Sequence, residues 1–274
     1  MSKNKFFAAA ALCVALGLAS CCNQQPRQLV ILQSNDSHSQ IEPCANGQGG
    51  YASRKHFIDS IRATHDNVLL IDAGDIFQGT PYFNMFNGRL EIAGYNLMGY
   101  EATTFGNHEF DKGIDTLAAR MREANFPYIC CNYDVAGTAI DGLVKPYIVL
   151  EKKGLRVGIL GLGVDPHGLI LADNFGGIKY LDPVEVANTN ADKLRHQEKC
   201  DFVIALSHLG YSSDPEVMSD SLIAVRSHDI DLILGGHTHE IRGVFDIPNA
   251  DGKIVKVMQT GKSAKELDMI VVEY

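Results

Sequence analysis

The sequence predicts an α/β protein in which two β-sheets pack face to face and helices cover both outer surfaces, a four-layer α/β/β/α sandwich. Three observations lead to this prediction. Short apolar runs typical of buried strands alternate with segments of helical periodicity. Four of five short polar motifs follow such a run and the other follows a weaker one, which places active groups at strand ends. The 274 residues, 46% of them hydrophobic, contain no repeat and no convincing linker, so we expect a single domain.

The strand predictions rest on apolar runs bounded by turn signals. The expected strands are residues 28–33, 68–71, 147–150, 155–162, 201–206, 230–234, 241–245, 254–258 and 269–272. The third and fourth of these flank Glu-Lys-Lys-Gly at residues 151–154, which predicts a hairpin.

The helix predictions rest on apolar residues that recur every three or four positions. The expected helices are residues 51–64, 90–98, 114–124 and 183–197. In the first, Phe57, Ile58 and Ile61 have helical spacing, and the last opens with Pro183, a residue favoured in the first turn. Strands separated by helices imply sheets that are covered on their outer faces.

The N-terminus has the features of a secretory signal. Two lysines precede an apolar run, residues 6–18, that is too short to span a membrane permanently. The following Leu18-Ala19-Ser20-Cys21 resembles the bacterial lipobox. We therefore expect residues 1–20 to be a lipoprotein signal peptide, Cys21 to carry lipid, and residues 21–27 to be a lipidated tether. An ordinary cleaved signal is the alternative interpretation.

This N-terminus predicts an exported bacterial lipoprotein, periplasmic or associated with the outer membrane. No later segment of the sequence is long and apolar enough to span a membrane, so attachment would be through the lipid anchor alone. The formal charge of −9 falls to about −11 when residues 1–20, with two lysines and no acids, are removed. An acidic chain without a basic run argues against a nucleic-acid polymer as a partner.

The cysteines do not suggest a disulfide framework or a zinc–thiolate site. Cys130 and Cys131 are adjacent and follow an apolar run, which favours small core residues over bridges. A bridge between two of the other cysteines is left open, and none has the paired spacing of a zinc site.

Five polar motifs carry the chemistry of the chain. In order they are Asn35-Asp36-Ser37-His38, Gly74-Asp75-Ile76-Phe77-Gln78-Gly79, Gly106-Asn107-His108-Glu109-Phe110-Asp111, Ser207-His208-Leu209-Gly210 and Gly236-His237-Thr238-His239. Each is a weak signal alone, because Asp and His near strand ends are often turn or surface residues. As an ordered set of Asp, Asn and His side chains at strand ends, they predict a hydrolytic centre with two divalent metals.

The spacing within the motifs suggests how the ligands would be presented. Alternate residues of an extended chain point the same way, so Asp36 and His38 could reach one cation, and the two histidines of the last motif repeat this spacing. Asp75 could bridge two cations, with Asp72 as a competitor whose place inside the apolar run favours a structural contact.

The third and fourth motifs add ligands of a different kind. Asn107 offers a neutral amide oxygen, which leaves the adjacent His108 free for catalysis, and His208 adds another imidazole. Gln78 and Glu109 are expected only to make hydrogen bonds around the ligands. The remaining histidines are interpreted as surface or helix residues; they are His56, His65, His167, His196 and His228.

The charge of this ligand set favours an anionic substrate. Two divalent cations would bring four positive charges, whereas Asp36 and Asp75 return two negative ones and Asn107 is neutral. The centre would remain positive with one hydroxide bound, which suits a phosphate ester. Mixed imidazole and carboxylate ligands suit manganese, zinc, iron or cobalt better than calcium.

The five motifs, in this order, resemble those of the calcineurin-like metallophosphoesterases, and the nearest branch is the N-terminal catalytic domain of the periplasmic 5′-nucleotidase and UDP-sugar hydrolase family. The likeness runs from about Leu29 to the C-terminus and includes Gly49-Gly50-Tyr51-Ala52 and Gly142-Leu143-Val144-Lys145-Pro146-Tyr147. The resemblance implies a metallophosphoesterase domain over residues 28–274.

The resemblance also implies a role for each site residue. One metal would be held by Asp36, His38, Asp75 and His239, and the other by Asp75, Asn107, His208 and His237. His108, beside Asn107, would contact the transferring phosphoryl group or protonate the leaving oxygen, and Asp111 would orient its ring.

Two departures from the family pattern limit what the resemblance implies. Ser39 stands where a glycine is common, and the chain ends soon after the last motif, where the family normally continues into a C-terminal nucleotidase domain. We therefore expect that domain to be absent, and a separately encoded one is a possible partner. The expected function is hydrolysis of a phosphorylated small molecule, a monoester of the nucleotide type. The alternatives are a phosphodiesterase of cyclic nucleotides or other diesters, and a lipid-anchored metal-binding subunit that needs the partner.

Overall fold

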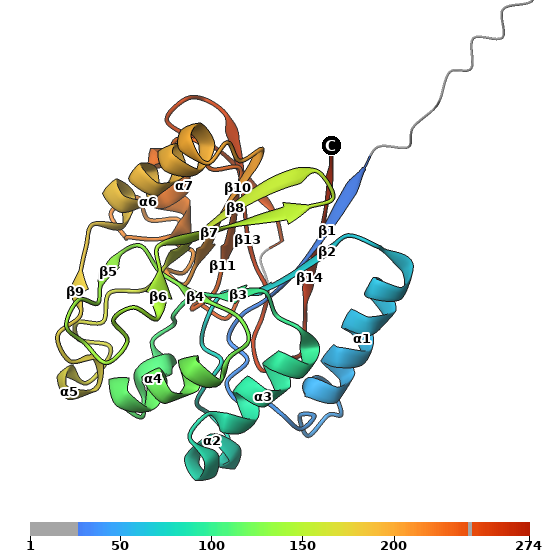
Figure 1. Cartoon of the computed structure of the whole chain (residues 1–274), viewed down its shortest axis with the longest axis vertical. Helices are drawn as coiled ribbons and strands as arrows, with labels where there is room; N and C mark the ends of the chain where they lie inside the picture. The colour runs from blue at the N-terminus through green and yellow to red at the C-terminus, as the bar shows by residue number, and fades with distance from the viewer. Residues whose placement is uncertain (1–26, 241–242) are drawn as a thin grey trace, which may run out of the picture.

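The computed structural model describes residues 27–240 and 243–274; the expected signal peptide, Cys21 and most of the tether lie outside this part of the chain. Two six-stranded sheets face each other and helices pack against their outer surfaces, as the ribbon view shows (Figure 1). The predicted four-layer α/β/β/α architecture is confirmed.

The first sheet brings the ends of its parallel strands to one edge. Its order is β14 (Asp268–Glu273), β1 (Gln28–Ser34), β2 (Val68–Asp72), β3 (Ala102–Thr103), β4 (Tyr128–Ile129) and β6 (Val144–Lys145). Only β14 runs antiparallel to its neighbour. Ser34 is in register with Asp72, and Asp72 with Thr103, so the loops that follow β1, β2 and β3 start side by side.

The second sheet repeats this arrangement on the other side of the core. Its order is β12 (Phe245–Pro248), β13 (Ile254–Gln259), β11 (Leu232–Gly235), β10 (Phe202–Ser207), β8 (Leu155–Leu162) and β7 (Tyr147–Lys152). The strands from β13 to β8 are parallel, and β7 and β8 form the predicted hairpin. A separate two-stranded sheet pairs β5 (Tyr133–Asp134) with β9 (Lys179–Tyr180).

The helices divide between the two outer faces. The first sheet is covered by α1 (Tyr51–Thr64), α3 (Arg89–Met98) and α4 (Ile114–Glu123), with the short α2 (Pro81–Phe86) packed beside α3. The second is covered by α6 (Pro183–Asp192), which continues as the π-helix η2 (Lys193–Gln197), and by α7 (Asp220–Arg226). The remaining helical turns are η1 (His108–Phe110) and α5 (Ala172–Phe175).

Strand β1 shows how the sequence pattern produces the layers. Leu29 and Ile31 belong to the apolar core between the sheets, whereas Val30 and Leu32 pack under the helices of the outer face. Side chains alternate across a strand, so a continuous apolar run is what a sheet buried on both faces requires.

The structure corrects one predicted strand. Residues 241–242 are outside the described part, residues 243–244 are not in a strand, and β12 begins at Phe245 rather than ending there. Cys130 and Cys131 are buried core residues as expected, and they are free thiols together with Cys44 and Cys200. In the described part of the chain, none of the helices has the length and apolar character needed to cross a membrane.

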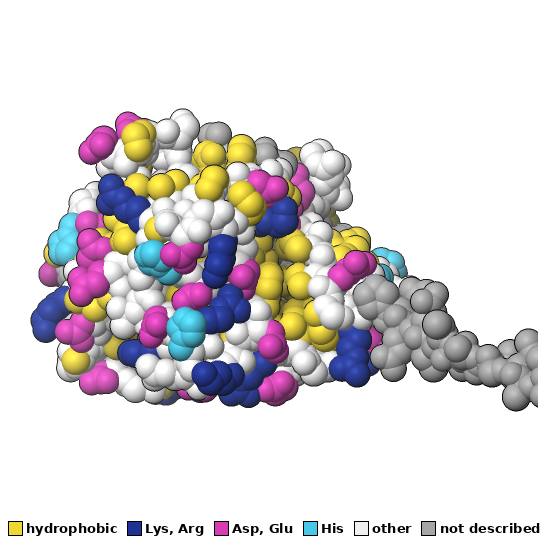
Figure 2. All heavy atoms as spheres, turned by 90° about the horizontal axis from the view of Figure 1, so that it is seen from above, with side chains coloured by type: hydrophobic (Ala, Val, Ile, Leu, Met, Phe, Trp, Pro, Cys, Tyr) yellow, Lys and Arg dark blue, Asp and Glu magenta, His cyan; other side chains and the backbone are white. Residues whose placement is uncertain are grey.

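The face seen from above in Figure 2 mixes basic and acidic side chains rather than gathering either kind. Basic side chains of the β7–β8 hairpin are paired with acidic side chains from neighbouring segments. Lys152 lies 2.5 Å from Glu101, Lys153 pairs with Asp66, and Arg156 contacts Glu198 at 3.6 Å. Paired surface charges of this kind produce little net field.

Candidate metal centre

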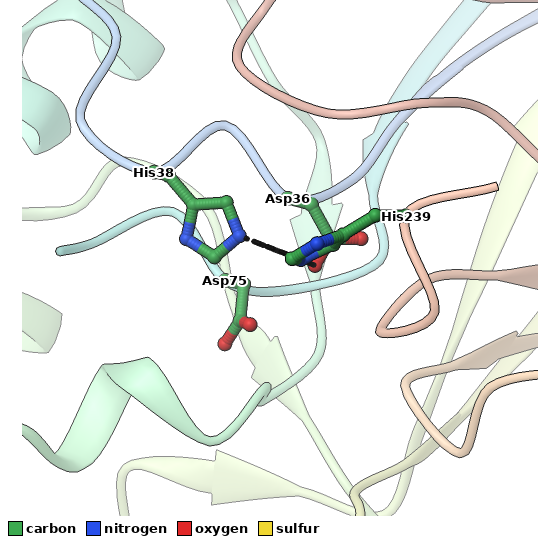
Figure 3. Close-up of side chains that lie close together, drawn as sticks. All are labelled: Asp36, His38, Asp75 and His239. Atoms are coloured by element: carbon green, nitrogen blue, oxygen red, sulfur yellow. Dashed lines mark hydrogen bonds and ion pairs between the residues drawn. The ribbon is translucent and has the colours of Figure 1, made fainter. Parts of the chain in front are cut away.

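The polar motifs converge where the strands of both sheets end. The loops after β1, β2 and β3 approach those after β10 and β11, although the contacting residues His38 and His239 are 201 positions apart in the chain. Figure 3 shows side chains from three of these loops turned toward one another. This is the edge at which parallel α/β sheets commonly bind ligands.

The backbone at these ligands differs from the expected extended chain. Asp36 has φ 48°, His38 φ 45°, His237 φ 76° and His239 φ 61°, all in the left-handed region. Asp36 and His38 do share a cluster, as their spacing suggested, whereas His237 and His239 fall in different clusters. Tight turns, not alternation along a strand, aim these side chains. Left-handed backbone in non-glycine residues stores strain, a feature that clusters at functional sites.

The first cluster consists of Asp36, His38, Asp75 and His239, which offer ligand atoms that all lie within 4.8 Å of one another. The Nε2 atoms of His38 and His239 are 2.9 Å apart, and Asp36 Oδ1 lies 3.2 Å from His239 Nε2 (Figure 3). Two imidazole nitrogens and carboxylate oxygens in so small a volume match the donor set of a transition-metal site.

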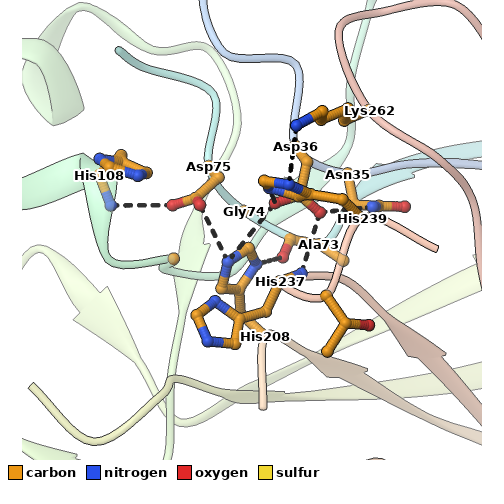
Figure 4. Close-up of polar contacts among 12 residues, drawn as sticks. Asn35, Asp36, Ala73, Gly74, Asp75, His108, His208, His237, His239 and Lys262 are labelled. Atoms are coloured by element: carbon orange, nitrogen blue, oxygen red, sulfur yellow. Dashed lines mark hydrogen bonds and ion pairs between the residues drawn. The ribbon is translucent and has the colours of Figure 1, made fainter. Parts of the chain in front are cut away.

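The second cluster shares Asp75 with the first and adds His208 and His237. His208 Nε2 lies 3.2 Å from Asp75 Oδ2, while its Nδ1 is 2.6 Å from the carbonyl oxygen of Ala73 (Figure 4). Because a carbonyl only accepts, Nδ1 donates a hydrogen bond to Ala73, and Nε2 is the ring nitrogen that faces the centre.

Several buried atoms of the centre have no hydrogen-bond partner within the described part of the chain. They include Asp36 Oδ1, Asn107 Oδ1 and His208 Nε2. Buried polar atoms are normally paired, so three neighbouring atoms of metal-ligand type without hydrogen-bond partners fit a cation site. Asn107 lies between Gly106, which packs closely against Asp75, and His108, whose backbone N–H donates to Asp75 Oδ1, so this residue is a neighbour of the shared carboxylate. The residues present fit divalent metal ions.

The other oxygen of Asp36 is held in place by hydrogen bonds. Asp36 Oδ2 accepts from Asn35 Nδ2 at 2.5 Å and from the backbone N–H of His237 at 2.9 Å, which leaves Oδ1 for the centre (Figure 4). Glu109 plays a similar role for the second motif: its carboxylate accepts from the N–H groups of Asp75 and Gly106 at 2.9 and 2.6 Å. The expected hydrogen-bonding role of Glu109 is correct.

The electrostatics keep Asp36 and Asp75 ionised and His237 neutral. Burial raises the pKa of Asp75, but the charge of His208 outweighs it and the pKa falls below its usual value; Asp36 shifts in the same direction for the same reasons. Burial lowers the pKa of His208, yet the carboxylates of Asp75 and Asp36 raise it to about 10. Burial, followed by the charge of His208, lowers the pKa of His237 to about 4. A neutral His237 has a lone pair available to a metal.

His108 stands at the edge of the centre. Its backbone N–H donates to Asp75 Oδ1 at 2.8 Å, and its Nδ1 lies 2.9 Å from Asp111 Oδ2 (Figure 4). The side chain is 28% exposed, so solvent and substrate can reach the ring. Burial lowers the pKa of His108, but the Asp111 hydrogen bond and the charge of Asp75 raise it above its usual value. The structure thus brings together the pair expected from the sequence.

Some residues near the centre were not anticipated from the sequence. Lys262 Nζ lies 3.2 Å from His239 Nδ1 (Figure 4), on the loop that follows β13. The sequence does contain a signal for the placement of Lys262 near the centre. The segment Gln259-Thr260-Gly261-Lys262 follows an expected strand, as the polar motifs do. Asp72 does not join the centre: it is fully buried and bonded to Ser34, Tyr95 and Gly74.

The other histidines lie away from the centre. His56, His167, His196 and His228 are exposed and His65 is half-buried, as expected for surface and helix positions. His196 does group with Asp192 and Asp229, but the side chains of His196 and Asp192 are well exposed and their contacts are those of surface ion pairs.

The family described as Calcineurin-like phosphoesterase matches residues 29–240, which span all five motifs. The chain belongs to this family. The resemblance inferred from the motifs is confirmed, and with it the assignment to a metal-dependent class of hydrolases.

Relatives of this phosphoesterase chain include two 5′-nucleotidases. It is 32% identical over 247 residues to the 5′-nucleotidase of Vibrio cholerae, covering 83% of this chain and 44% of that protein. It is 34% identical over 240 residues to a snake venom 5′-nucleotidase of Crotalus adamanteus, covering 83% and 39%. The chain thus spans less than half the length of these relatives.

A solved structure with the same fold is the 5′-nucleotidase precursor of Thermus thermophilus. Its TM-score is 0.80 at 30% sequence identity, and the match covers 90% of this chain and 51% of that one. The NAD nucleotidase of Haemophilus influenzae gives a TM-score of 0.79 at 27% identity over 91% and 48% of the two chains.

Proposed function

We propose that this phosphoesterase hydrolyses phosphate monoesters of the nucleotide type with two divalent metal ions. The observation that carries the proposal is Asp75, whose carboxylate belongs to both ligand clusters and also anchors the backbone of His108. A carboxylate shared by two cation sites, with a titratable group beside it, is the arrangement of two-metal hydrolysis.

Each residue has a role in this proposal. The first metal would be held by Asp36, His38, Asp75 and His239, and the second by Asp75, Asn107, His208 and His237. When bound, such ions supply Lewis acidity and a water of lowered pKa; manganese, zinc, iron and cobalt suit these donors.

Phosphoryl contact and proton transfer would be carried out by residues other than the shared ligand Asp75. In the proposal, Asn107 and His108 would contact the transferring phosphoryl group. Asp111 accepts a hydrogen bond from Nδ1 of His108, so Nε2 is the atom that passes a proton to the leaving oxygen. Asp111 holds the ring in that orientation and favours its protonated form.

Two substitutions test these assignments. His108→Ala should lower turnover by about 10²–10⁴-fold while both metals stay bound, because general acid catalysis typically contributes that much. Near-normal turnover would remove His108 from the mechanism. Asp75→Asn should reduce occupancy of both metal sites, and full occupancy by elemental analysis would refute the shared ligand.

Hydrolysis by the purified chain alone tests the reaction. The substrates are 5′-AMP, UDP-glucose, a 2′,3′-cyclic nucleotide and an aryl phosphodiester, each with manganese, zinc or a chelator. Chelator-sensitive release of phosphate from 5′-AMP would support the proposal. We include this substrate because the relatives of the chain are named 5′-nucleotidases. Cleavage of the diesters alone would favour a phosphodiesterase. Two bound metals without hydrolysis would favour a subunit that needs a separately encoded nucleotide-binding domain.

The proposal extends to location. Residues 1–20 would be removed on export and Cys21 acylated, which anchors the enzyme by lipid alone in the periplasm or at the outer membrane. The lipobox-like Leu18-Ala19-Ser20-Cys21 supports this. Labelled palmitate should be incorporated into the expressed protein but not into Cys21→Ala, and a soluble, unlabelled wild-type protein would instead indicate an ordinary signal.

A further inference from the structure

A closed ring of hydrogen bonds lies beneath the first two metal-binding loops. Its charged members are Arg54 of α1 and Asp72 at the end of β2, which are 4% and 0% exposed. No direct ion pair joins them within the described part of the chain; hydroxyl groups connect them instead. A buried charge pair separated in this way depends on every hydroxyl between its members.

Two routes of hydrogen bonds run from Arg54 to Asp72, and a longer contact of 3.5 Å also joins Arg54 Nη1 directly to Tyr95 Oη. In one, Arg54 Nη1 lies 2.7 Å from Ser37 Oγ, Ser37 Oγ 2.7 Å from Tyr95 Oη, and Tyr95 Oη donates to Asp72 Oδ2 at 2.9 Å. In the other, Arg54 Nη1 donates to Tyr100 Oη at 3.2 Å, Tyr100 contacts Ser34 Oγ at 2.7 Å, and Ser34 donates to Asp72 Oδ2 at 2.5 Å.

The chemistry of Arg54 and Asp72 fixes which atom donates and which accepts in every hydrogen bond of the ring. Arginine only donates and an ionised carboxylate only accepts, and each hydroxyl has a single proton to give. Ser37 must therefore donate to Tyr95, and Tyr100 to Ser34. All hydrogen bonds point from Arg54 toward Asp72. Removal of Arg54 therefore leaves the buried oxygens of Ser37 and Tyr100 without their donor, and removal of Asp72 leaves the hydroxyl protons of Ser34 and Tyr95 without their acceptor.

The ring is attached to both metal-binding loops. Ser37 lies between the candidate ligands Asp36 and His38, and its side chain points into the ring. On the other side, Asp72 Oδ1 accepts from the backbone N–H of Gly74, next to Asp75, at 2.9 Å. Backbone hydrogen bonds also pair the two loops, and the ring holds the side chain of Ser37 below them.

The turn that Ser37 anchors is strained. Asp36, His38 and Ser39 all have φ between 45° and 51°, in the left-handed region that disfavours side chains. Such conformations persist only where the surroundings over-determine them. The ring is the buried contact that holds the residue in the middle of this turn, so it can keep the ligands on either side turned toward the centre.

We propose that Arg54 and Asp72 are positioning residues of the metal centre, holding the strained turn of residues 36–39 in the shape that binds a cation. The inference rests on the metal centre of the proposed function. It predicts that loss of Arg54 weakens metal binding although no ligand is removed.

The test compares two buried arginines. Arg54→Met should lower the affinity for at least one cation by about 10–100-fold, the usual effect of removing a contact behind a metal ligand. Arg120→Met is the matched control, since Arg120 is 7% exposed and bonds to Asn87 and Glu123, away from the motifs. It should lower thermal stability but leave metal affinity unchanged. Zinc and manganese binding are measured by equilibrium dialysis with elemental analysis.

Smaller changes keep the test decisive if Arg54→Met fails to fold. Ser37→Ala and Tyr95→Phe each remove one hydroxyl from the ring, and each should weaken metal binding more than Arg120→Met does. Wild-type affinity in folded Arg54→Met, or in both of these variants, would overturn the inference. A wild-type protein that binds no metal would instead defeat the proposed function.

Discussion

Asp268 allows a quantitative test of the fold at a residue that is not a candidate metal ligand. It lies at the start of the edge strand β14, in register with Gln33 of β1, and its Oδ2 is buried without a hydrogen-bond partner in the described part of the chain. Burial, followed by the nearby charge of Glu266, raises its pKa from 3.8 to about 6. We predict that Asp268→Asn stabilises the protein at neutral pH.

The sign and size follow from linkage. The folded-state pKa lies above the unfolded value, so ionisation opposes folding, and stability is lost as the pH rises from about 4 to about 6. A shift of about two units corresponds to about 3 kcal/mol. We expect about 1–2 kcal/mol in practice, because the side chain of Asp268 is only partly buried and solvent screens its charge.

Urea denaturation at pH 4, 6 and 8 measures the effect. The gain of Asp268→Asn over wild type should be near zero at pH 4 and complete at pH 8. Glu266→Gln serves as a companion variant, which should give a smaller gain at pH 8 by removing one cause of the shift. Equal gains for Asp268→Asn at pH 4 and pH 8, or a loss at pH 8, would refute the reasoning.

Two further substitutions test the site and the core. Gly106→Ala should abolish metal binding in a folded protein, because its Cβ would lie 2.1 Å from Asp75 Oδ1. The control is Gly176→Ala, whose Cβ would meet only a carbonyl oxygen at 3.8 Å and which should bind metal normally. Equilibrium dialysis measures metal binding in both variants. Leu234→Ala should cost about 3 kcal/mol in urea unfolding, because the side chain is fully buried between the sheets. The exposed Val225→Ala, expected within about 0.5 kcal/mol of wild type, is its control.

The long strands and helices could be predicted because their patterns are strong. Strand β8 and helix α1 occupy the predicted residues, since each buries a face that requires a regular apolar repeat. Helix α7 was missed: it has only seven residues, too few for periodicity to show, although Ser219 caps it by accepting from Leu222 N–H. Two-residue strands such as β3 gain their partners from the sheet rather than from local sequence.

The candidate site could be predicted as a set of residues but not as a geometry. Asp36 and His38 were recognised from side-chain chemistry, which sequence displays directly. Their left-handed backbone was not, because it depends on tertiary contacts such as that of Ser37 with Arg54. Lys262 reaches His239 across 23 residues of chain, and such a contact exists only once the sheet has formed.

The distribution of the candidate ligands between the sheets has a consequence for regulation. Asp36 and Asp75 follow strands of one sheet, whereas His208, His237 and His239 follow strands of the other. An ion bound by ligands from both sheets would link the two sheets, so its binding free energy would also oppose their separation. Loss of the ion would then also destabilise the contact between the two sheets at the edge that holds these ligands. The protein would become more susceptible to proteases.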